Sequence, residues 1–467
     1  MISVGAVLRL YGLGDESLWN DELSSWARSQ AETLAAVAGR AAGDVHPPGY
    51  TFLLYFTQRY VGESEAALRL PSALAGIAAI WALAALGTRL YGAREGLVAA
   101  GLLAFGWTPI WYSQEARPYA LLLLFSIVST HCWVALLDHA RSGQPPSLAA
   151  RVAYVLAAIV TAYLHYFGLL LVGLHALGAI ARLRQPRALA RVALVYAVVA
   201  AAYLPWAASL LGAYARDHTW IDRPTAEAAA RYWSFLFREP HVLGAVAAAL
   251  CAAWGVQALR EHLRGARGES ADFHATPWLA AWLVVPFAIA FLQSVVSTPV
   301  LTSRNLIISL PAAYLLVARA VTALSRGSRL WPALPLVLVG LTASGLLTHR
   351  YYSEPQKQDF RGAAHWLAER EPRYPDSVIV AFAFNVRYFD YYLERTGADG
   401  RVALLAGKTS DIDKVDALLA RRSPRHLWHL AGHRIPEPGF LDHLRAVCRA
   451  VEEHQAKGVA ARLFECR

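Results

Sequence analysis

The chain has 467 residues, of which 56% are hydrophobic and 17% are charged. This composition excludes an ordinary soluble enzyme and indicates a protein that crosses a membrane several times. The formal net charge is +10, but the arginines lie in short links between apolar runs. That placement argues against a nucleic-acid-binding protein and is typical of cytoplasmic membrane loops.

The first eleven residues are apolar but too short to cross a membrane. As a helix they would extend about 16 Å, whereas the hydrocarbon core of a bilayer is about 30 Å thick. The segment has no basic start and no small-residue cleavage site, so a cleaved signal peptide is not predicted. It is either a partly embedded helix or the end of a span whose true start lies upstream of Met1, and we favour the second interpretation.

Further apolar runs recur along the chain at intervals typical of membrane-spanning helices. They cover residues 70–90, 96–112, 118–138, 151–164, 167–182, 191–211, 240–259, 277–296, 305–324 and 330–348. Together with the N-terminal helix they predict about eleven spans.

The links between these runs alternate in charge. Arginine-rich links lie at residues 87–96, 181–191, 259–269 and 325–330. Because basic loops stay on the cytoplasmic side, the alternation places these links and the N-terminus inside the cell. An odd number of spans then places the C-terminal segment outside.

One apolar run does not fit this count. The run from Pro47 to Val61 has only 15 residues, about 22 Å as a helix. Treating it as a span would reverse the side of every later link. We therefore expect an interfacial or re-entrant helix inside a long first outer loop, from about residue 12 to 69.

The chain changes character near residue 350, where its lysines begin. Short helices are predicted at 358–371, 385–395, 411–421 and 438–450, and strands at 376–383, 401–406, 426–431, 451–456 and 460–465. This alternation predicts a small α/β domain with a mainly parallel sheet, so that residues 1–349 form a membrane domain and 350–467 a second domain. Its two cysteines, Cys448 and Cys466, either form a disulfide in an oxidising compartment or stay unpaired.

The predicted outer links carry many polar side chains to one side of the membrane. The candidates are Asp15, Glu16, Asp21, Glu22, Asp44 and His46 in the first loop, with further groups at 113–119, 165–167, 212–239 and 297–305. Each alone is weak, since an Asp-Glu pair is usually solvated and a helix-end arginine such as Arg117 usually reaches the interface. Their convergence on one face favours a functional site.

Such a set of side chains suits transfer from a phosphate-linked donor. A carboxylate can take the proton from an attacking hydroxyl, and arginines can stabilise a leaving phosphate by bidentate contacts. Because phosphate leaves as a stable anion, no general acid is strictly required. A donor on a lipid phosphate would keep its chain among the helices and its head group at this face.

Four stretches of the sequence then occur in a familiar order. They are SLWNDE at 17–22, HPPGY at 46–50, EAALRLPSAL at 65–74 and YSQEARPY at 112–119. They resemble the membrane-embedded glycosyltransferases with the GT-C fold, of the protein O-mannosyltransferase and lipid A aminoarabinose transferase type. The resemblance is densest over residues 10–170 and implies a mainly α, polytopic membrane domain with juxtamembrane helices in the first outer loop, followed by a small C-terminal α/β domain.

The resemblance implies a bacterial inner-membrane enzyme that transfers a sugar, with inversion, from a polyprenyl-phosphate donor to an acceptor hydroxyl on the extracytoplasmic face. Asp21 matches the general base, and Glu22 would orient it or bind the acceptor. Arg117 and Arg304 would contact the donor phosphate. The expected substrate cavity contains His46, Glu115, Tyr119, His165 and Tyr166. No cofactor is expected to be required, a divalent metal is possible, and the acceptor is a lipid, glycan or protein.

Three other functions are weighed against this one. A transporter or lipid flippase would need polar groups near the bilayer midplane and often inverted repeats, and the sequence shows no clear repeat. An oligosaccharyltransferase-like enzyme or ligase would transfer a preassembled glycan, and metal dependence would favour it. A non-catalytic binding protein acting through its C-terminal domain fits less well, because the motifs lie in the membrane loops.

Overall fold

The chain folds into two compact units. The computed structural model describes residues 1–141, 146–183, 185–215, 221–238, 241–263, 272–325, 333–382, 386–398, 402–406, 412–432 and 438–466. The helical unit comprises Met1–Tyr11, Thr33–Leu53 and Arg69–Arg350. The α/β unit comprises Gly12–Glu32, Leu54–Leu68 and Tyr351–Arg467, so it joins the C-terminal segment with two parts of the predicted first outer loop.

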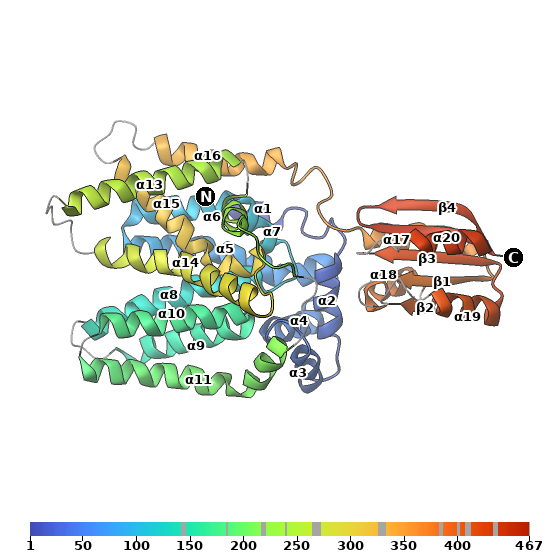
Figure 1. Ribbon diagram of the computed structural model, residues 1–467, viewed down its shortest axis with the longest axis horizontal. Coiled ribbons are helices and arrows are strands. Elements are labelled where there is room, and N and C mark those ends of the chain that lie inside the picture. Colours follow the sequence, from blue (N-terminus) through green and yellow to red (C-terminus); the bar gives the residue numbers. More distant parts are fainter. Residues whose placement is uncertain are drawn as a thin grey trace. The chain divides into compact units, whose positions relative to one another are not determined.

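The described residues up to Thr348 form a series of helices (Figure 1). They are α1 (Ile2–Leu10), α2 (Asn20–Ser29), α3 (Leu34–Ala42), α4 (Gly49–Tyr60), α5 (Glu65–Leu90), α6 (Ala93–Phe105), α7 (Trp107–Ser113), α8 (Tyr119–Arg141), α9 (Leu148–Leu164) and α10 (Tyr166–Arg182). The series continues with α11 (Pro186–Ala215), α12 (Ala228–Phe237), α13 (His241–Leu263), α14 (Asp272–Val296), the 3₁₀ helix η1 (Ser303–Ser309), α15 (Leu310–Leu324) and α16 (Ala333–Thr348).

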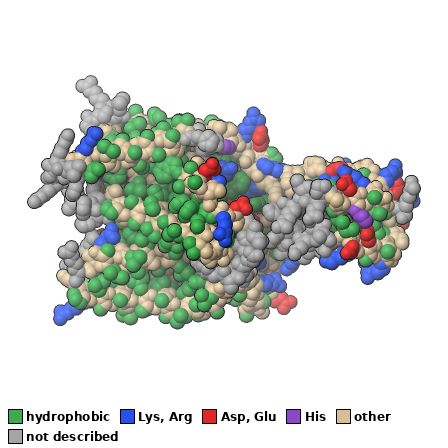
Figure 2. Space-filling view, in the orientation of Figure 1, with side chains coloured by type: hydrophobic (Ala, Val, Ile, Leu, Met, Phe, Trp, Pro, Cys, Tyr) green, Lys and Arg blue, Asp and Glu red, His purple; other side chains and the backbone are tan. Residues whose placement is uncertain are grey.

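Six helical segments in the described part of the chain are long and apolar enough to cross a membrane. They are Glu65–Leu90, Tyr119–Ala140, Pro186–Ala213, Val242–Arg260, Ala275–Val296 and Ser303–Leu324. Three shorter apolar helices, α9, α10 and α16, accompany them, and hydrophobic side chains cover the face of the helical unit visible in Figure 2. The protein is therefore a multi-pass membrane protein, as the sequence predicts.

The segment expected to be a span at 96–112 is broken into α6 and α7 at Gly106. A Cβ at this position would lie 2.8 Å from the carbonyl oxygen of Leu102 and 2.9 Å from the Tyr314 hydroxyl, so only glycine fits without displacement. The break leaves carbonyl groups at the end of α6 without helical partners. The buried Arg9 supplies donors to two of them, 2.8 Å from Leu103 O and 3.0 Å from Ala104 O.

The contacts of Arg9 with Leu103 and Ala104 fix the position of the short helix α1. α1 has nine residues, too few to cross a bilayer, and Arg9 joins it to the α6–α7 break. The Arg9 guanidinium also donates to Ser113 Oγ at 3.2 Å. α4 likewise has only 12 residues, about 18 Å, which agrees with its assignment as a helix that does not span.

The C-terminal segment forms a five-stranded sheet with strand order β2-β1-β3-β5-β4. Its strands are β1 (Ser377–Phe382), β2 (Val402–Ala406), β3 (His426–Gly432), β4 (Cys448–Ala456) and β5 (Val459–Cys466), accompanied by the 3₁₀ helices η2 (Glu371–Arg373) and η3 (Val386–Tyr388) and the α-helices α17 (Phe360–Arg370), α18 (Asp390–Thr396), α19 (Ile412–Arg422) and α20 (Pro438–Val447). Every residue of β1 is buried, as its apolar run from Val378 to Phe382 indicates for a central parallel strand.

The sheet is mixed rather than mainly parallel in its pairings. β1 pairs in parallel with β2 and β3, whereas β5 pairs antiparallel with β3 and β4. β4 and β5 are joined by Lys457 and Gly458 alone, and such a two-residue link can only reverse the chain. Gly458 has φ +67°, a conformation that favours glycine. Cys448 and Cys466, which pair across the two strands, form a disulfide.

Candidate functional site

The helical unit contains a cavity of about 290 Å³. Its lining comes from the ends of several helices: Tyr119 begins α8, His165 separates α9 from α10, Ala213 lies near the end of α11, Gln293 near the end of α14, and Arg304 in η1. Links that are far apart in the sequence thus meet at one site. Of the predicted cavity residues, His46, Tyr119, His165 and Tyr166 line it, and so does the predicted phosphate contact Arg304.

The cavity has two kinds of lining. Its apolar part includes Leu169, Leu170, Leu210 and Ile289, and its polar part includes His46, His165, Gln293, Arg304 and Asn305. An apolar surface beside a cation and hydrogen-bonding groups fits a ligand that has a hydrocarbon chain and an anionic head.

Two histidines define the polar part. The ring centroids of His46 and His165 are 4.9 Å apart, and that of Tyr119 lies 6.2 Å from His46 and 6.1 Å from His165. His165 caps α10, because its Nδ1 accepts a hydrogen bond from the Phe167 backbone N–H at 3.1 Å. The proton of the neutral ring is therefore on Nε2. His46 Nδ1 lies 3.8 Å from Asp44 Oδ2.

Both imidazoles are uncharged at neutral pH. Burial lowers the pKa of His165 well below 6.5, and the neighbouring His46 and the Arg117 guanidinium lower it further. Burial and then Arg117 also lower the pKa of His46, although Asp44 acts in the opposite direction. The positive charge of Arg304 is therefore not joined by two imidazolium charges, and the rings can contact neutral hydroxyl groups.

Glu115 and Arg117 lie in the link before α8 and are buried. The Arg117 guanidinium carbon is 5.9 Å from the centre of the Tyr119 ring, and its charge acts on both histidines. Burial raises the pKa of Tyr112 well above 10, and the Glu115 carboxylate raises it further. Arg117 is thus an electrostatic neighbour of the cavity, while Glu115 acts on Tyr112.

The two predicted catalytic carboxylates lie in the α/β unit, at the start of α2. Within residues 20–27 only Asp21 is partly exposed, and its Oδ1 accepts a hydrogen bond from Asn20 Nδ2 at 3.2 Å. The amino end of a helix favours an ionised carboxylate. Asp21 therefore lies where a negatively charged side chain is favoured.

Glu22 has a different setting. Its side chain is fully buried; Oε2 accepts from the Trp19 backbone N–H at 3.3 Å, and Oε1 lies 3.4 Å from Lys357 Nζ. The backbone contact is half of a capping box, which stabilises the first turn of α2. The sequence suggests that Glu22 orients Asp21 or binds the acceptor. In the structure, its contacts are those of a group that stabilises the start of α2.

Gln293, Asn305 and Lys357 were not among the predicted site residues, although Asn305 lies in the predicted polar link at 297–305. Gln293 is a polar residue in the last turn of an otherwise apolar span, a pattern that could have identified it. Asn305 follows the predicted Arg304 directly. Lys357 gave no signal, because its partner Glu22 is 335 positions away in the chain. Among the described residues, no group of three or more histidine, cysteine, aspartate or glutamate side chains could hold a metal ion.

Comparisons with known proteins agree with this architecture. Residues 45–206 match the family model of dolichyl-phosphate-mannose-protein mannosyltransferases. ArnT from Cupriavidus metallidurans, in the apo state, is 16% identical with a TM-score of 0.59, and the match covers 99% of this chain and 96% of ArnT. The chain therefore has an ArnT-like fold, the GT-C fold.

Two other GT-C structures are similar over most of this chain. The oligosaccharyltransferase AglB from Archaeoglobus fulgidus, solved with an inhibitory peptide and a dolichol-phosphate, is 10% identical with a TM-score of 0.54, and the match covers 92% of this chain and 68% of AglB. The arabinofuranosyltransferase AftD from Mycobacteria is 15% identical with a TM-score of 0.53, and the match covers 99% of this chain and 41% of AftD. A search of curated proteins found no match.

Proposed function

We propose that this GT-C protein is an inverting glycosyltransferase that moves a sugar from a polyprenyl-phosphate donor to an acceptor hydroxyl. The observation that supports this most directly is the cavity of about 290 Å³ in which apolar side chains adjoin Arg304, Asn305 and the two histidines. A polyprenyl phosphate has the same division between hydrocarbon and anion. An ArnT structure with the same fold binds undecaprenyl phosphate.

In the proposed reaction, Asp21 takes the proton of the acceptor hydroxyl while the hydroxyl oxygen attacks the anomeric carbon. The bond between this carbon and the phosphate oxygen breaks, and polyprenyl phosphate leaves as an anion. Attack opposite to the leaving group inverts the configuration. Arg304 and Arg117 stabilise the negative charge that develops on the phosphate.

We also propose that the reaction takes place on the extracytoplasmic face of a bacterial inner membrane. The alternating arginine-rich links support this orientation. The disulfide between Cys448 and Cys466 fits the same assignment, because disulfides persist in oxidising compartments outside the cytoplasm.

The proposal is tested with purified protein in lipid nanodiscs. A panel of polyprenyl-phosphate sugars is combined with lipid A, cell-wall glycan and peptide acceptors, with and without a divalent-metal chelator, and products are identified by mass spectrometry. We expect one donor to give a glycosylated acceptor and an equal amount of free polyprenyl phosphate. Movement of a labelled lipid or solute across the bilayer with no glycosidic bond formed by any pair would overturn the proposal and identify a transporter.

A further inference from the structure

The first turn of α2 receives partners from a segment more than 330 residues later in the chain. Helix starts leave backbone N–H groups without intrahelical acceptors. Here the Asn20 N–H donates to Gln358 Oε1 at 3.2 Å, and the Trp19 N–H donates to Glu22 Oε2 at 3.3 Å. The neighbouring Lys357 contacts the second oxygen of Glu22. The carboxylate that caps the helix is therefore itself held by a lysine.

The ion pair between Glu22 and Lys357 is enclosed. The side chains are 0% and 3% exposed, respectively, and Nζ lies 3.4 Å from Oε1. In a buried pair, removal of one partner leaves a charge that water cannot solvate. The position of Glu22, and with it the first turn of α2, therefore depends on Lys357.

Lys357 is fixed in turn by its own neighbours. The backbone N–H groups of Gln356 and Lys357 both donate to Glu16 Oε1, the second at 3.3 Å. Asp359 N donates to the carbonyl of Lys457, in the β4–β5 link, at 2.9 Å. Residues 356–361, here called the clasp, thus connect the loop that carries α2 with the five-stranded sheet.

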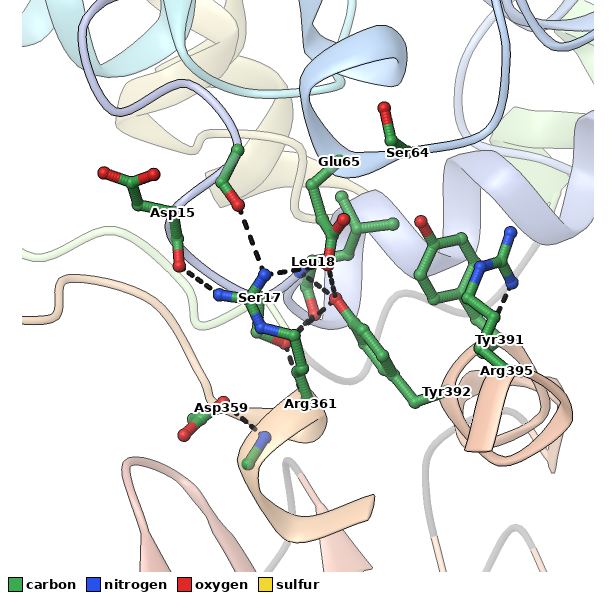
Figure 3. Close-up of polar contacts among 12 residues, drawn as sticks. Asp15, Ser17, Leu18, Ser64, Glu65, Asp359, Arg361, Tyr391, Tyr392 and Arg395 are labelled. Carbon is green, nitrogen blue, oxygen red and sulfur yellow. Dashed lines mark hydrogen bonds and ion pairs between the residues drawn. The ribbon is translucent and has the colours of Figure 1, made fainter. Parts of the chain in front are cut away.

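Arg361, at the end of the clasp, also contacts the loop that carries α2 (Figure 3). The Arg361 guanidinium donates to the Gly14 carbonyl at 3.2 Å and to Glu65 Oε1 at 3.2 Å, and it contacts the carbonyl of Asp15. Tyr392, from α18, accepts the Leu18 N–H at 2.7 Å and donates to Glu65 Oε1 at 3.1 Å. Hydrogen bonds to Arg361 and Tyr392 thus connect the loop, on both sides of Ser17, to the C-terminal part of the chain.

We propose that Lys357 is a positioning residue for Asp21. By neutralising Glu22 it fixes the first turn of α2, and the adjacent Asp21 carboxylate takes its direction from that turn. The C-terminal segment thus acts in the chemical step through the clasp. This inference rests on the proposed function, in which Asp21 is the base.

The test is a double-mutant cycle on the purified enzyme. Lys357→Met removes the charge and keeps an unbranched side chain that is one atom shorter. We expect kcat to fall about 10- to 100-fold, as for a displaced catalytic group, with the KM for the polyprenyl-phosphate donor unchanged. The combination Glu22→Gln with Lys357→Met removes both charges and should restore most of kcat. Lys414→Met, an exposed lysine of α19, is the matched control and should leave both constants unchanged.

The outcomes separate this inference from the function on which it rests. Full kcat in Lys357→Met, with Asp21→Asn inactive, would overturn the positioning role and leave the proposed function intact. An active Asp21→Asn would overturn the proposed base whatever Lys357 does. Should Lys357→Met fail to fold, the neutral double variant decides: a near-normal kcat supports the inference, and a kcat as low as that of Asp21→Asn contradicts it.

Discussion

The imidazole rings of His46 and His165 lie 4.9 Å apart in an edge-to-face arrangement at the polar side of the cavity. His46 precedes α4 and His165 separates α9 from α10, so the fold brings together two histidines from distant links. With Arg117 and Arg304 nearby, neither ring gains a proton readily. The pair therefore contributes neutral hydrogen-bonding groups beside a fixed cation.

This arrangement predicts how stability depends on pH. The pKa of His165 is lowered well below 6.5 in the folded protein. Just below pH 6.5, the unfolded chain therefore binds a proton at His165 that the folded protein does not bind. The free energy of unfolding is therefore highest, with respect to His165, above pH 6.5. It decreases as the pH falls below 6.5, by about 1.4 kcal/mol for each pH unit over which the folded and unfolded states differ by one proton.

His165→Gln should flatten this dependence, because glutamine does not titrate yet can still accept the Phe167 N–H. The measurement is the thermal unfolding midpoint in detergent between about pH 5 and pH 8. His139→Gln, which replaces an exposed histidine of α8, should behave like the unaltered protein. Equal slopes for all three proteins would contradict the assignment.

Arg304 and Arg117 should act on the donor rather than on the acceptor. Replacing either by alanine removes charge-assisted contacts to a phosphate, each worth about 1.5–3 kcal/mol, or about a 10- to 100-fold change. We expect the donor KM to rise by this factor with little change in the acceptor KM. Initial-rate kinetics with each substrate varied in turn will measure it.

The control for these arginines is Arg231→Ala, since Arg231 is exposed and its described polar contacts, with Glu227 and Thr225, are both local. A donor KM that stays constant in both Arg304→Ala and Arg117→Ala would rule out a phosphate contact at this end of the helices.

Asp21→Asn should abolish sugar transfer and preserve the fold. The change removes the proton acceptor with almost no change in shape, and loss of a general base costs about 100- to 10,000-fold in rate. Single-turnover product formation, together with the thermal midpoint, separates a chemical defect from a folding defect. Asp15→Asn alters an exposed carboxylate of the same loop and should retain activity, whereas full turnover by Asp21→Asn would refute its role.

The sequence predicts the elements well where the signal is local. β1 was expected at 376–383 and lies at Ser377–Phe382, and α17 was expected at 358–371 and lies at Phe360–Arg370. Apolar periodicity carries this information within a single element. The convergence of Tyr119, His165 and Arg304 on one cavity also followed from topology, because alternate links of a membrane bundle share a side.

Contacts set by tertiary packing could not be predicted in this way. The α6–α7 break depends on how closely Tyr314 approaches Gly106, which no local pattern records. The assignment of Gly12–Glu32 to the same unit as Tyr351–Arg467 depends on contacts such as Glu22–Lys357. Side-chain pairs between remote segments leave no periodic trace in a single sequence.

A buried ion pair in the helical unit makes a prediction that is independent of catalysis. Arg319 of α15 donates to Glu95 Oε1 of α6 at 2.9 Å, and Thr322 donates to the same oxygen at 2.8 Å. The two charged side chains are 4% and 6% exposed. α15 belongs to the Ser303–Leu324 span, and 94% of the most apolar stretch of that span is buried. The pair therefore joins a central helix to its neighbour.

Arg319→Met should lower the free energy of unfolding by about 3–5 kcal/mol, because it leaves the Glu95 carboxylate buried without its cation. Adding Glu95→Gln should recover most of that loss. Arg89→Met is the matched control: its pair with Asp138, at a similar 2.8 Å, is 32% and 52% exposed and should contribute at most about 1 kcal/mol. Denaturant unfolding in mixed micelles will measure the three variants beside the unaltered protein, and a loss from Arg319→Met no larger than that from Arg89→Met would show that the buried pair does not hold α15 to α6.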